Sequence, residues 1–319
     1  MKKIFVVSSI NMDLTINAPR MPKEGETVEG DSFFISPGGK GGNQAVACAK
    51  AGCDTYLITA LGNTFKDELL NSLKDNNVHT DYIDTVDNLS SGIAIITLKD
   101  NNNRIIVDKG SNNSITKELI DKALSIAKTG DILICGYEIN IDATDYALHA
   151  AKEKGMITIL NPSPVFDRID LFELVDHLIL NEVETEYYTG INPTNKKKEV
   201  KSLKLLSELC KGNIIITLGG NGSSTLINNE YVHIESYSNR LEVVDTIAAG
   251  DTYLGYFASK IVEGASLVDA LKYASCASAL AVSKRGAQKS IPTKKEVEEF
   301  IRRENIWIKP KIQIKAEKH

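Results

Sequence analysis

The 319-residue sequence predicts an α/β fold, a doubly wound and mostly parallel sheet flanked by helices, with a small antiparallel β-sheet as a lid. Short apolar runs rich in β-branched residues alternate with longer amphipathic stretches, which is typical of repeated β-α units. Two pairs of apolar runs have no helical pattern between them, so they do not fit a parallel sheet, which needs long crossover connections. We therefore assign them to a separate lid.

The β-α units follow one another along most of the chain. The first strand is expected at residues 4–7, and a helix at about 43–51 is closed by Gly52. Further helices are expected at 65–76, after a polar turn, and at 293–303, where the charge density is high. The remaining main-sheet strands are expected at 55–60, 132–135, 157–160, 177–180 and 214–218.

The lid is built from four expected strands. They lie at about residues 12–20, 28–36, 92–98 and 104–108, the last two forming a hairpin around the polar turn 99–103. A separate sheet beside a ligand crevice would act as a lid. The alternative is a set of irregular surface hairpins. The main body then spans residues 1–303, with a turn at 285–292, and a tail at 304–319 either adds an edge strand or is loose.

Composition excludes several classes of function. The formal net charge is −5, and Lys and Arg are scattered, so we expect no nucleic acid partner. No stretch approaches the roughly 18 apolar residues of a membrane span, and no export signal is recognised, so a cytoplasmic protein without a membrane partner is expected. The five cysteines contain no Cys-x-x-Cys pair and are expected to be buried, reduced thiols.

The segment from Asp245 to Thr252 is the sharpest chemical feature. It is expected to follow a short strand at 241–244 and to open a helix at about 249–262. The small residues Ala248, Ala249 and Gly250 leave room for a ligand at a helix N-terminus, which favours negative charge. Asp251 then lies where a carboxylate can accept a proton from a hydroxyl that attacks a bound phosphate. Alternatively, Asp251 only complements the helix dipole.

Two glycine-rich turns complete the pattern. Residues 37–45 hold four glycines (Gly38, Gly39, Gly41, Gly42) around Lys40 before a helix, which indicates that backbone passes close to another group and that Lys40 and Asn43 suit a polyhydroxy ligand. The spacing is not that of a Walker A motif. Residues 217–222 follow a predicted strand and are a candidate nucleotide loop, although Gly-Asn-Gly also forms ordinary turns.

These motifs, in this order, resemble the PfkB family of carbohydrate kinases, and the finer resemblance is to the ribokinases within it. Other matching segments are Ile10 to Asp13, Asn161 to Pro164, Asn181 to Glu184, and Gly286 to Pro292. The resemblance covers about residues 3–303. It implies a sugar kinase that transfers a phosphoryl group from ATP to a hydroxymethyl oxygen, D-ribose O5 being the first expectation.

The resemblance also implies site residues. Sugar-binding positions are Asn11, Met12, Asp13, Gly39, Lys40, Gly41, Gly42, Asn43 and Glu138. Asp251 takes the base position, with Ala248, Ala249 and Gly250 as anion hole. Nucleotide positions are Asn181, Thr217, Leu218, Gly219, Gly220, Asn221, Gly222, Ala249, Gly250 and Ser275. Two departures are Leu254, where many ribokinases have Asn, and the loose segment 135–138 that carries Glu138.

The resemblance implies two metal ions and a dimer. Glu184 would act on Mg²⁺ through water. K⁺ would be held largely by main-chain oxygens of Asp245, Ile247, Ala281, Lys284, Gly286 and Ser290. In some relatives a side-chain ammonium replaces this ion, and Lys284 is the candidate here, ranked below the ion. The lid sheet would pair two subunits as a homodimer.

Two competing readings of function remain. A kinase for 2-deoxyribose, fructose or a nucleoside would share the base and anion hole and differ only in the sugar pocket. A sugar-sensing module without turnover would use the fold alone. We expect such a sensor to have a damaged Asp251 or Ala249-Gly250, and both are intact.

Overall fold

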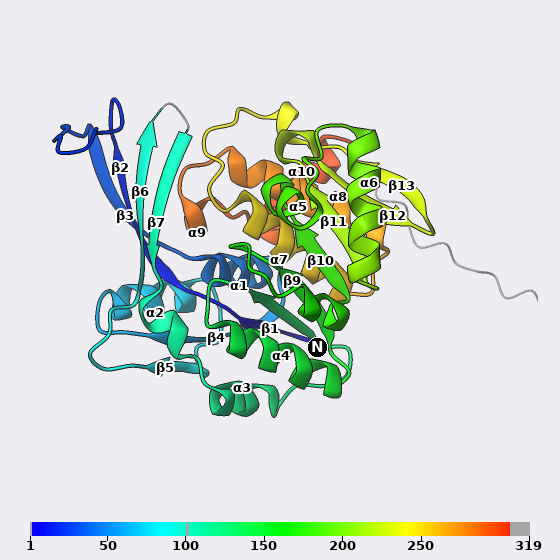
Figure 1. The fold of residues 1–319 in the computed structure, drawn as a ribbon, viewed down its shortest axis with the longest axis horizontal. Helices are drawn as coiled ribbons and strands as arrows, with labels where there is room; N and C mark the ends of the chain where they lie inside the picture. The colour runs from blue at the N-terminus through cyan, green and yellow to red at the C-terminus, as the bar shows by residue number, and fades with distance from the viewer. Residues whose placement is uncertain (1, 100–101, 307–319) are drawn as a thin grey trace, which may run out of the picture.

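The structure is a computed structural model that describes residues 2–99 and 102–306. Its main body is a nine-stranded sheet (Figure 1). In spatial order the strands are β13 (Glu230–Ile234), β12 (Ser223–Ile227), β11 (Asn213–Thr217), β10 (His177–Leu180), β9 (Ile157–Asn161), β8 (Ile132–Gly136), β1 (Lys3–Val7), β4 (Asp54–Leu61) and β5 (Ile83–Thr85).

The sheet is mostly parallel, as predicted. Every pair from β11 to β5 is parallel, and only β12 and β13 run antiparallel at one edge. Strands β5, β12 and β13 were not predicted from the sequence. A turn at Asn228 and Asn229, with φ of 52° and 64°, joins the last two strands, and asparagine tolerates this left-handed region better than most residues.

Both faces of the sheet are buried. Along β1, Ile4 and Val6 enter one hydrophobic cluster, whereas Phe5 and Val7 enter the other. Such two-sided burial explains why the strands read as continuous apolar runs. Helices α1 (Lys40–Lys50), α2 (Lys66–Asp75), α7 (Ala249–Val262), α8 (Leu267–Val282) and α10 (Lys294–Arg303) pack on the first cluster.

The opposite face is covered by a second set of helices. They are α3 (Lys117–Leu124), α4 (Ile141–Glu153), α5 (Glu182–Thr189) and α6 (Lys196–Leu209). Shorter helical turns are η1 (Gly110–Ser114), η2 (Ile169–Leu174), η3 (Gly219–Asn221), η4 (Ser238–Arg240) and α9 (Ala287–Ser290). No helix within the described ranges is long and apolar enough to cross a membrane.

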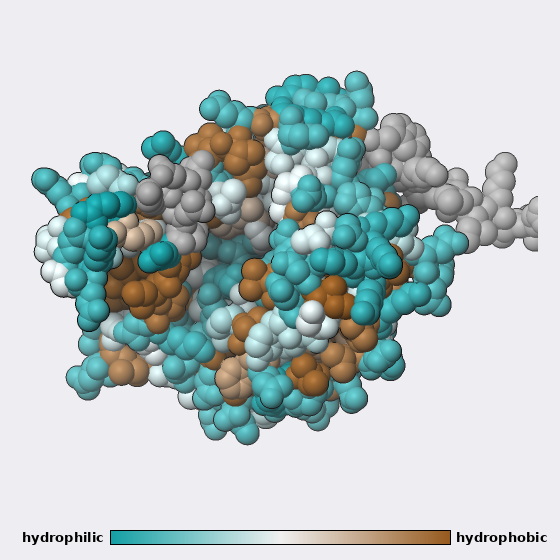
Figure 2. Space-filling view, turned by 45° about the horizontal axis from the view of Figure 1, so that its top comes forward, coloured by the Kyte–Doolittle hydropathy of each residue, from teal (hydrophilic) through white to brown (hydrophobic). Residues whose placement is uncertain are grey.

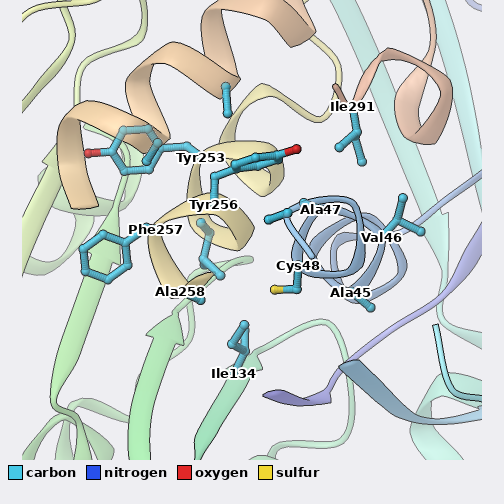
Figure 3. Packing of buried hydrophobic residues seen from close by; sticks show 14 of the residues in the cluster. Ala45, Val46, Ala47, Cys48, Ile134, Tyr253, Tyr256, Phe257, Ala258 and Ile291 are labelled. Atoms are coloured by element: carbon cyan, nitrogen blue, oxygen red, sulfur yellow. The ribbon is translucent and has the colours of Figure 1, made fainter. Parts of the chain in front are cut away.

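Helices α1 and α7 approach each other closely (Figure 3). A Cβ on Gly255 would lie 2.4 Å from Cβ of Ala47, so only glycine permits this spacing. The thiol of Cys48 donates to the carbonyl oxygen of Gly255 at 3.6 Å. All five cysteines are free and four are buried, as expected, while Cys53 is half-buried.

The lid is a four-stranded sheet that extends from the body, with order β3-β2-β6-β7 (Figure 1). Its strands are β2 (Asn11–Asn17), β3 (Ser32–Gly38), β6 (Gly92–Lys99) and β7 (Asn102–Asp108). The predicted lid is correct, but its central pair, β2 and β6, is parallel and not antiparallel. Asn11 and Gly92 are partners at the start of this pair, so both strands leave the body in the same direction.

Three local predictions were wrong or fall outside the described residues. Residues 241–244 form no strand, because the N–H groups of Val244 and Asp245 donate to Val282 O at the end of α8. The turn at 285–292 contains the short helix α9. Of the tail, residues 304–306 are described and are not a strand, and residues 307–319 lie outside the described part.

Candidate active site

The carboxyl ends of the parallel strands and the N-terminus of α7 surround a cavity of about 560 Å³. Ligands of open α/β sheets bind at this edge of the sheet. Figure 2 shows the molecule hollowed between the lid and the rest of the chain. Predicted residues that line the cavity are Lys40, Asn181, Thr217, Gly219, Gly220, Gly222, Ala248, Ala249, Gly250, Asp251 and Ser275.

The N-terminus of α7 forms one wall of this cavity. Ala248 precedes the helix with φ 58° and ψ 11°, and no side chain caps the first turn. No atom outside the local helix lies within 4 Å of a Cβ built on Gly250. Because a helix N-terminus attracts anions, this open, uncapped turn fits a phosphoryl group.

Asp251 lies in the first turn of α7 and is buried. Its Oδ2 accepts from Asn43 Nδ2 at 3.0 Å, and its Oδ1 accepts from Gln44 Nε2 at 3.1 Å. Burial raises the pKa of Asp251, and the charge of Lys40 and these two amides act against that rise. A carboxylate between an open helix N-terminus and a cluster of polar side chains is placed to accept a proton.

Lys40 lies between this wall and the neighbouring cluster of polar side chains. Burial lowers its pKa, but Asp251, Glu138 and Glu184 act in the other direction and leave the pKa above its ordinary value. Its ammonium group is therefore charged at neutral pH. A half-buried cation among carboxylates, at the cavity wall, suits the binding of phosphate oxygens.

The expected sugar-binding side chains gather beside Asp251. Glu138 accepts from the backbone N–H of Lys40 at 3.1 Å and from the hydroxyl of Ser9. Burial, together with the charges of Glu138 and Asp251, raises the pKa of Asp13 to about 7. Asn43 Oδ1 is buried without a protein partner, so it can accept a hydrogen bond from a ligand hydroxyl.

The glycine-rich segment passes close to the chain itself. A Cβ on Gly38 would lie 2.0 Å from Oδ2 of Asp13, and one on Gly39, where φ is 80°, would lie 2.6 Å from the N of Asn11. Gly41 similarly meets Ser8 at 2.5 Å. The helix begins at Lys40, three residues earlier than predicted, so Gly41 and Gly42 belong to its first turn.

Asn112, which was not predicted from the sequence, contacts the expected sugar-binding residue Asn11. Its side chain accepts from the N–H of Ile10 at 2.9 Å and donates to Asn11 Oδ1 at 2.8 Å. A Cβ on Gly92 would lie 2.1 Å from Asn11 Oδ1 and 2.2 Å from Asn112 Nδ2. Asn112 therefore fixes Asn11 at the base of the lid. Met12, in β2, is buried in the core.

The candidate nucleotide loop 217–222 divides into two parts. Gly219 and Gly220 have free space around a built Cβ, whereas a Cβ on Gly222 would lie 2.0 Å from Ile234 O, which makes that glycine a packing requirement. Leu218 is buried in the core, and Asn221 is exposed and does not line the cavity. Ser275 lines the cavity and donates to Glu235 O at 2.8 Å.

Glu184 and Asn181 form a capping box at the start of α5. Glu184 Oε2 accepts from the N–H of Asn181 at 2.9 Å, and Asn161 Nδ2 lies 3.3 Å from the same oxygen. Burial raises the pKa of Glu184, and Lys40 acts against that rise. Since protein donors already occupy its oxygens, Glu184 suits a metal contact through water better than a direct one.

Asp245 joins the two loops expected to hold a monovalent cation. Its Oδ1 accepts from the N–H of Ile247 and its Oδ2 from the N–H of Gly286, both at 3.0 Å. Ser290 is buried and donates to Ala287 O, and Ala281 is buried at the end of α8. The ammonium of Lys284 pairs with Glu296 Oε1 at 2.7 Å, so it is occupied elsewhere.

The family model described as pfkB family carbohydrate kinase matches residues 1–294. The chain belongs to this family. The family assignment makes the protein a sugar kinase, in agreement with a helix N-terminus that lines a cavity beside polar side chains.

Similar proteins agree with the pfkB assignment. The chain is 35% identical to a ribokinase from Dictyostelium discoideum over 92% of this chain and 98% of that protein. It is 32% identical to a deoxyribokinase from Salmonella typhi over 93% and 98%. A ribokinase structure from Arabidopsis thaliana, complexed with ribose and ATP, superposes with TM-score 0.82 at 29% identity, covering 94% of this chain and 98% of that one.

Several residues lining the cavity of this pfkB kinase were not predicted. They are Glu182, Ser236, Ser238, Val243, Thr246, Tyr253, Ser278, Ala279 and Val282. Thr246 and Glu182 lie inside predicted motifs, so the motif spacing carried a signal for them. The others come from helices and loops whose local patterns indicate only packing.

Proposed function

We propose that this kinase phosphorylates D-ribose at O5 with ATP to give D-ribose 5-phosphate and ADP. The observation that carries the proposal is Asp251, a buried carboxylate at the open start of α7, next to the polar side chains of Asp13 and Asn43. The ribose and ATP named for the Arabidopsis thaliana ribokinase support this choice of substrates.

The mechanism follows from the chain's own groups. Asp251 accepts the proton of the sugar hydroxyl as its oxygen attacks the γ-phosphorus, and the bond between that phosphorus and the β,γ-bridging oxygen breaks to release ADP. The N–H groups at residues 249–251 and the ammonium of Lys40 stabilise the negative charge on the phosphoryl oxygens. The small side chains of Ala248 and Ala249 and the bare backbone of Gly250 leave room for these phosphoryl oxygens.

The residues for two metal ions fit their proposed roles. Glu184 and Asn181 would hold Mg²⁺ through water, and the ion would offset the charge of the ATP phosphates. The loops joined by Asp245 and Gly286 offer carboxylate and carbonyl oxygens, the hard ligands that K⁺ takes, with Ile247, Ala281, Lys284 and Ser290 as further donors. Because Lys284 pairs with Glu296, its ammonium is a poor substitute for the ion.

We also propose a homodimer formed through the lid. Ile35, Ile95 and Ile106 stand in one cross-strand row of the small sheet, with exposed fractions of 46%, 51% and 72%. A hydrophobic patch marks the lid side of the surface (Figure 2). Exposed apolar faces of this kind are typical of interaction sites.

A cytoplasmic location is likewise proposed, supported by the five free cysteines.

The second candidate function is phosphorylation of 2-deoxyribose, favoured by the identity to the Salmonella typhi deoxyribokinase. The two activities differ in the 2-hydroxyl, which Asp13 and Asn43 would bind. A coupled ADP-release assay with ribose, 2-deoxyribose, fructose and nucleosides separates these functions. The proposal predicts the highest kcat/KM with ribose. A higher value for any other acceptor, or no ADP release with any of them, would contradict it.

A further inference from the structure

Gln44 holds the second oxygen of the Asp251 carboxylate. It follows Asn43 in α1, is 2% exposed, and donates from Nε2 to Asp251 Oδ1 at 3.1 Å. Asn43 donates to Oδ2 of the same carboxylate at 3.0 Å. One amide on each oxygen fixes the orientation of the carboxylate, since rotation would break both hydrogen bonds.

Close packing of the two helices makes this arrangement possible. Consecutive side chains on a helix diverge by about 100°, so two of them reach one carboxylate only if it lies close to the helix. Gly255, one turn after Asp251, provides that approach, because its Cβ position lies 2.4 Å from Ala47 Cβ. Gln44 thus contacts Asp251 from the body side and is not among the residues lining the cavity.

The charges around Asp251 show what the amide of Gln44 contributes. Burial raises the pKa of Asp251; Lys40, Asn43 and Gln44 lower it, and Glu138 raises it further. Asp13 is close enough for the charge of Asp251 to raise the Asp13 pKa. Two carboxylates and burial therefore favour the protonated, inactive form of a base, and Gln44 supports the ionised form.

We propose that Gln44 is a positioning residue for the phosphoryl transfer, which keeps Asp251 ionised and aimed at the sugar hydroxyl. The inference rests on the proposed function, in which Asp251 is the base. Asn43 and Gln44 each have a side-chain oxygen that is buried without a protein partner, and the proposed function assigns the sugar contact to Asn43. The hydrogen bond of the Gln44 side chain goes to Asp251. Loss of the Gln44 amide should therefore change kcat and its pH profile more than KM.

Two substitutions separate this role from packing. Gln44→Met keeps the length of the side chain but removes the N–H, and Gln44→Glu places a second ionisable carboxyl beside Asp251. Removing a hydrogen bond to the charged form should move the acid limb of the kcat profile up by about one pH unit for Gln44→Met. Gln44→Glu should move it further, because like charges add repulsion. KM for sugar and ATP should change less than about twofold.

The matched control is Gln288→Met, which removes another buried side-chain amide. Gln288 belongs to α9, and its Nε2 lies 3.2 Å from the Cβ position of Gly42 in the first turn of α1. Gln288 accepts from Ser72 Oγ and has no recorded contact with Asp251. This variant should leave the acid limb in its wild-type position. If all three variants lower the melting temperature and kcat together without moving the limb, Gln44 is only structural and the proposal is wrong.

A measurement without turnover keeps this test separate from that of the proposed function. In protein labelled with ¹³C at the aspartate carboxyl carbons, the Asp251 signal is assigned by its loss in Asp251→Asn, and its titration gives the pKa directly. The proposal predicts a higher Asp251 pKa in Gln44→Met than in the wild type, whatever sugar the enzyme accepts. An unchanged pKa overturns it.

Discussion

Asn43 Nδ2 donates to Asp251 Oδ2 at 3.0 Å across 208 residues of sequence. This bond joins the glycine-rich start of α1, beside the sugar-binding side chains, to the start of α7, beside the anion site. The group proposed to bind the sugar hydroxyl and the group proposed to remove its proton are thus held as one unit. Geometry of this kind reduces the entropy cost of bringing the reacting groups together.

Gly250→Ala tests the anion site at the start of α7. Nothing outside the local helix lies within 4 Å of the new Cβ, and alanine in a helix is favoured over glycine by about 0.5 to 1 kcal/mol, so the melting temperature should hold or rise. The methyl group would occupy cavity space, so kcat/KM for ATP should fall. Gly255→Ala is the contrast in the same helix: it clashes with Ala47 and should lower the melting temperature. Full activity of Gly250→Ala would argue against phosphoryl binding there.

Asp13 predicts a pH dependence of stability. Its pKa in the folded protein is about 7, above the ordinary value of 3.8, with burial as the main cause. Stability linked to this group is fully present below pH 4 and is lost as pH rises through about 7. The melting temperature without sugar should therefore fall between pH 5 and 8, and Asp13→Asn should flatten this fall while weakening sugar binding.

The control for this slope is Asp176→Asn, which removes a carboxylate whose pKa is lowered despite burial, with Lys152 as its main partner. Stability from such a group is lost as pH falls, so this variant should change the acid side of the curve and leave the pH 5 to 8 slope intact. Equal slopes for the wild type and Asp13→Asn would show that Asp13 does not titrate in this range.

The cation prediction rests on Asp245, which bridges to Gly286 at 3.0 Å. Rates in potassium, sodium and tetramethylammonium buffers at matched ionic strength should be highest in potassium, mainly through kcat, because the loops border the anion site. Lys284→Met should keep this dependence, since its ammonium pairs with Glu296. Equal rates in all three buffers would contradict a cation site.

Much of the main sheet could be predicted because strands buried on both faces appear in the sequence as continuous apolar runs. The strand at residues 177–180 matches β10, and 249–262 matches α7 in full. Residues 241–244 carry a similar apolar pattern, but the neighbouring backbone donates to Val282 O, so tertiary contact decided against a strand. The parallel pairing of β2 and β6 depends on where each strand leaves the body, which no local pattern encodes.

The site residues likewise divide into those that a local sequence pattern predicts and those that depend on distant contacts. The motif around Asp251 could be recognised from the sequence because small residues before a helix leave room for an anion at the helix N-terminus. Asn112 and Gln44 were missed because their partners lie 101 and 207 residues away, and a buried amide in a helix reads as ordinary packing. The glycines of residues 37–45 were predicted to let the backbone pass close to another group, and Gly38 and Gly39 do so beside Asp13 and Asn11.

The central claim is that Asp251 is the base of a sugar phosphorylation, and Asp251→Asn tests it most directly. The amide keeps the size of the side chain but cannot accept the proton at neutral pH. Calorimetric binding of ribose should persist, while kcat in the ADP-release assay should fall at least about 10²-fold, the loss typical of a missing general base. Turnover near the wild-type rate with ribose still bound would remove Asp251 from the mechanism.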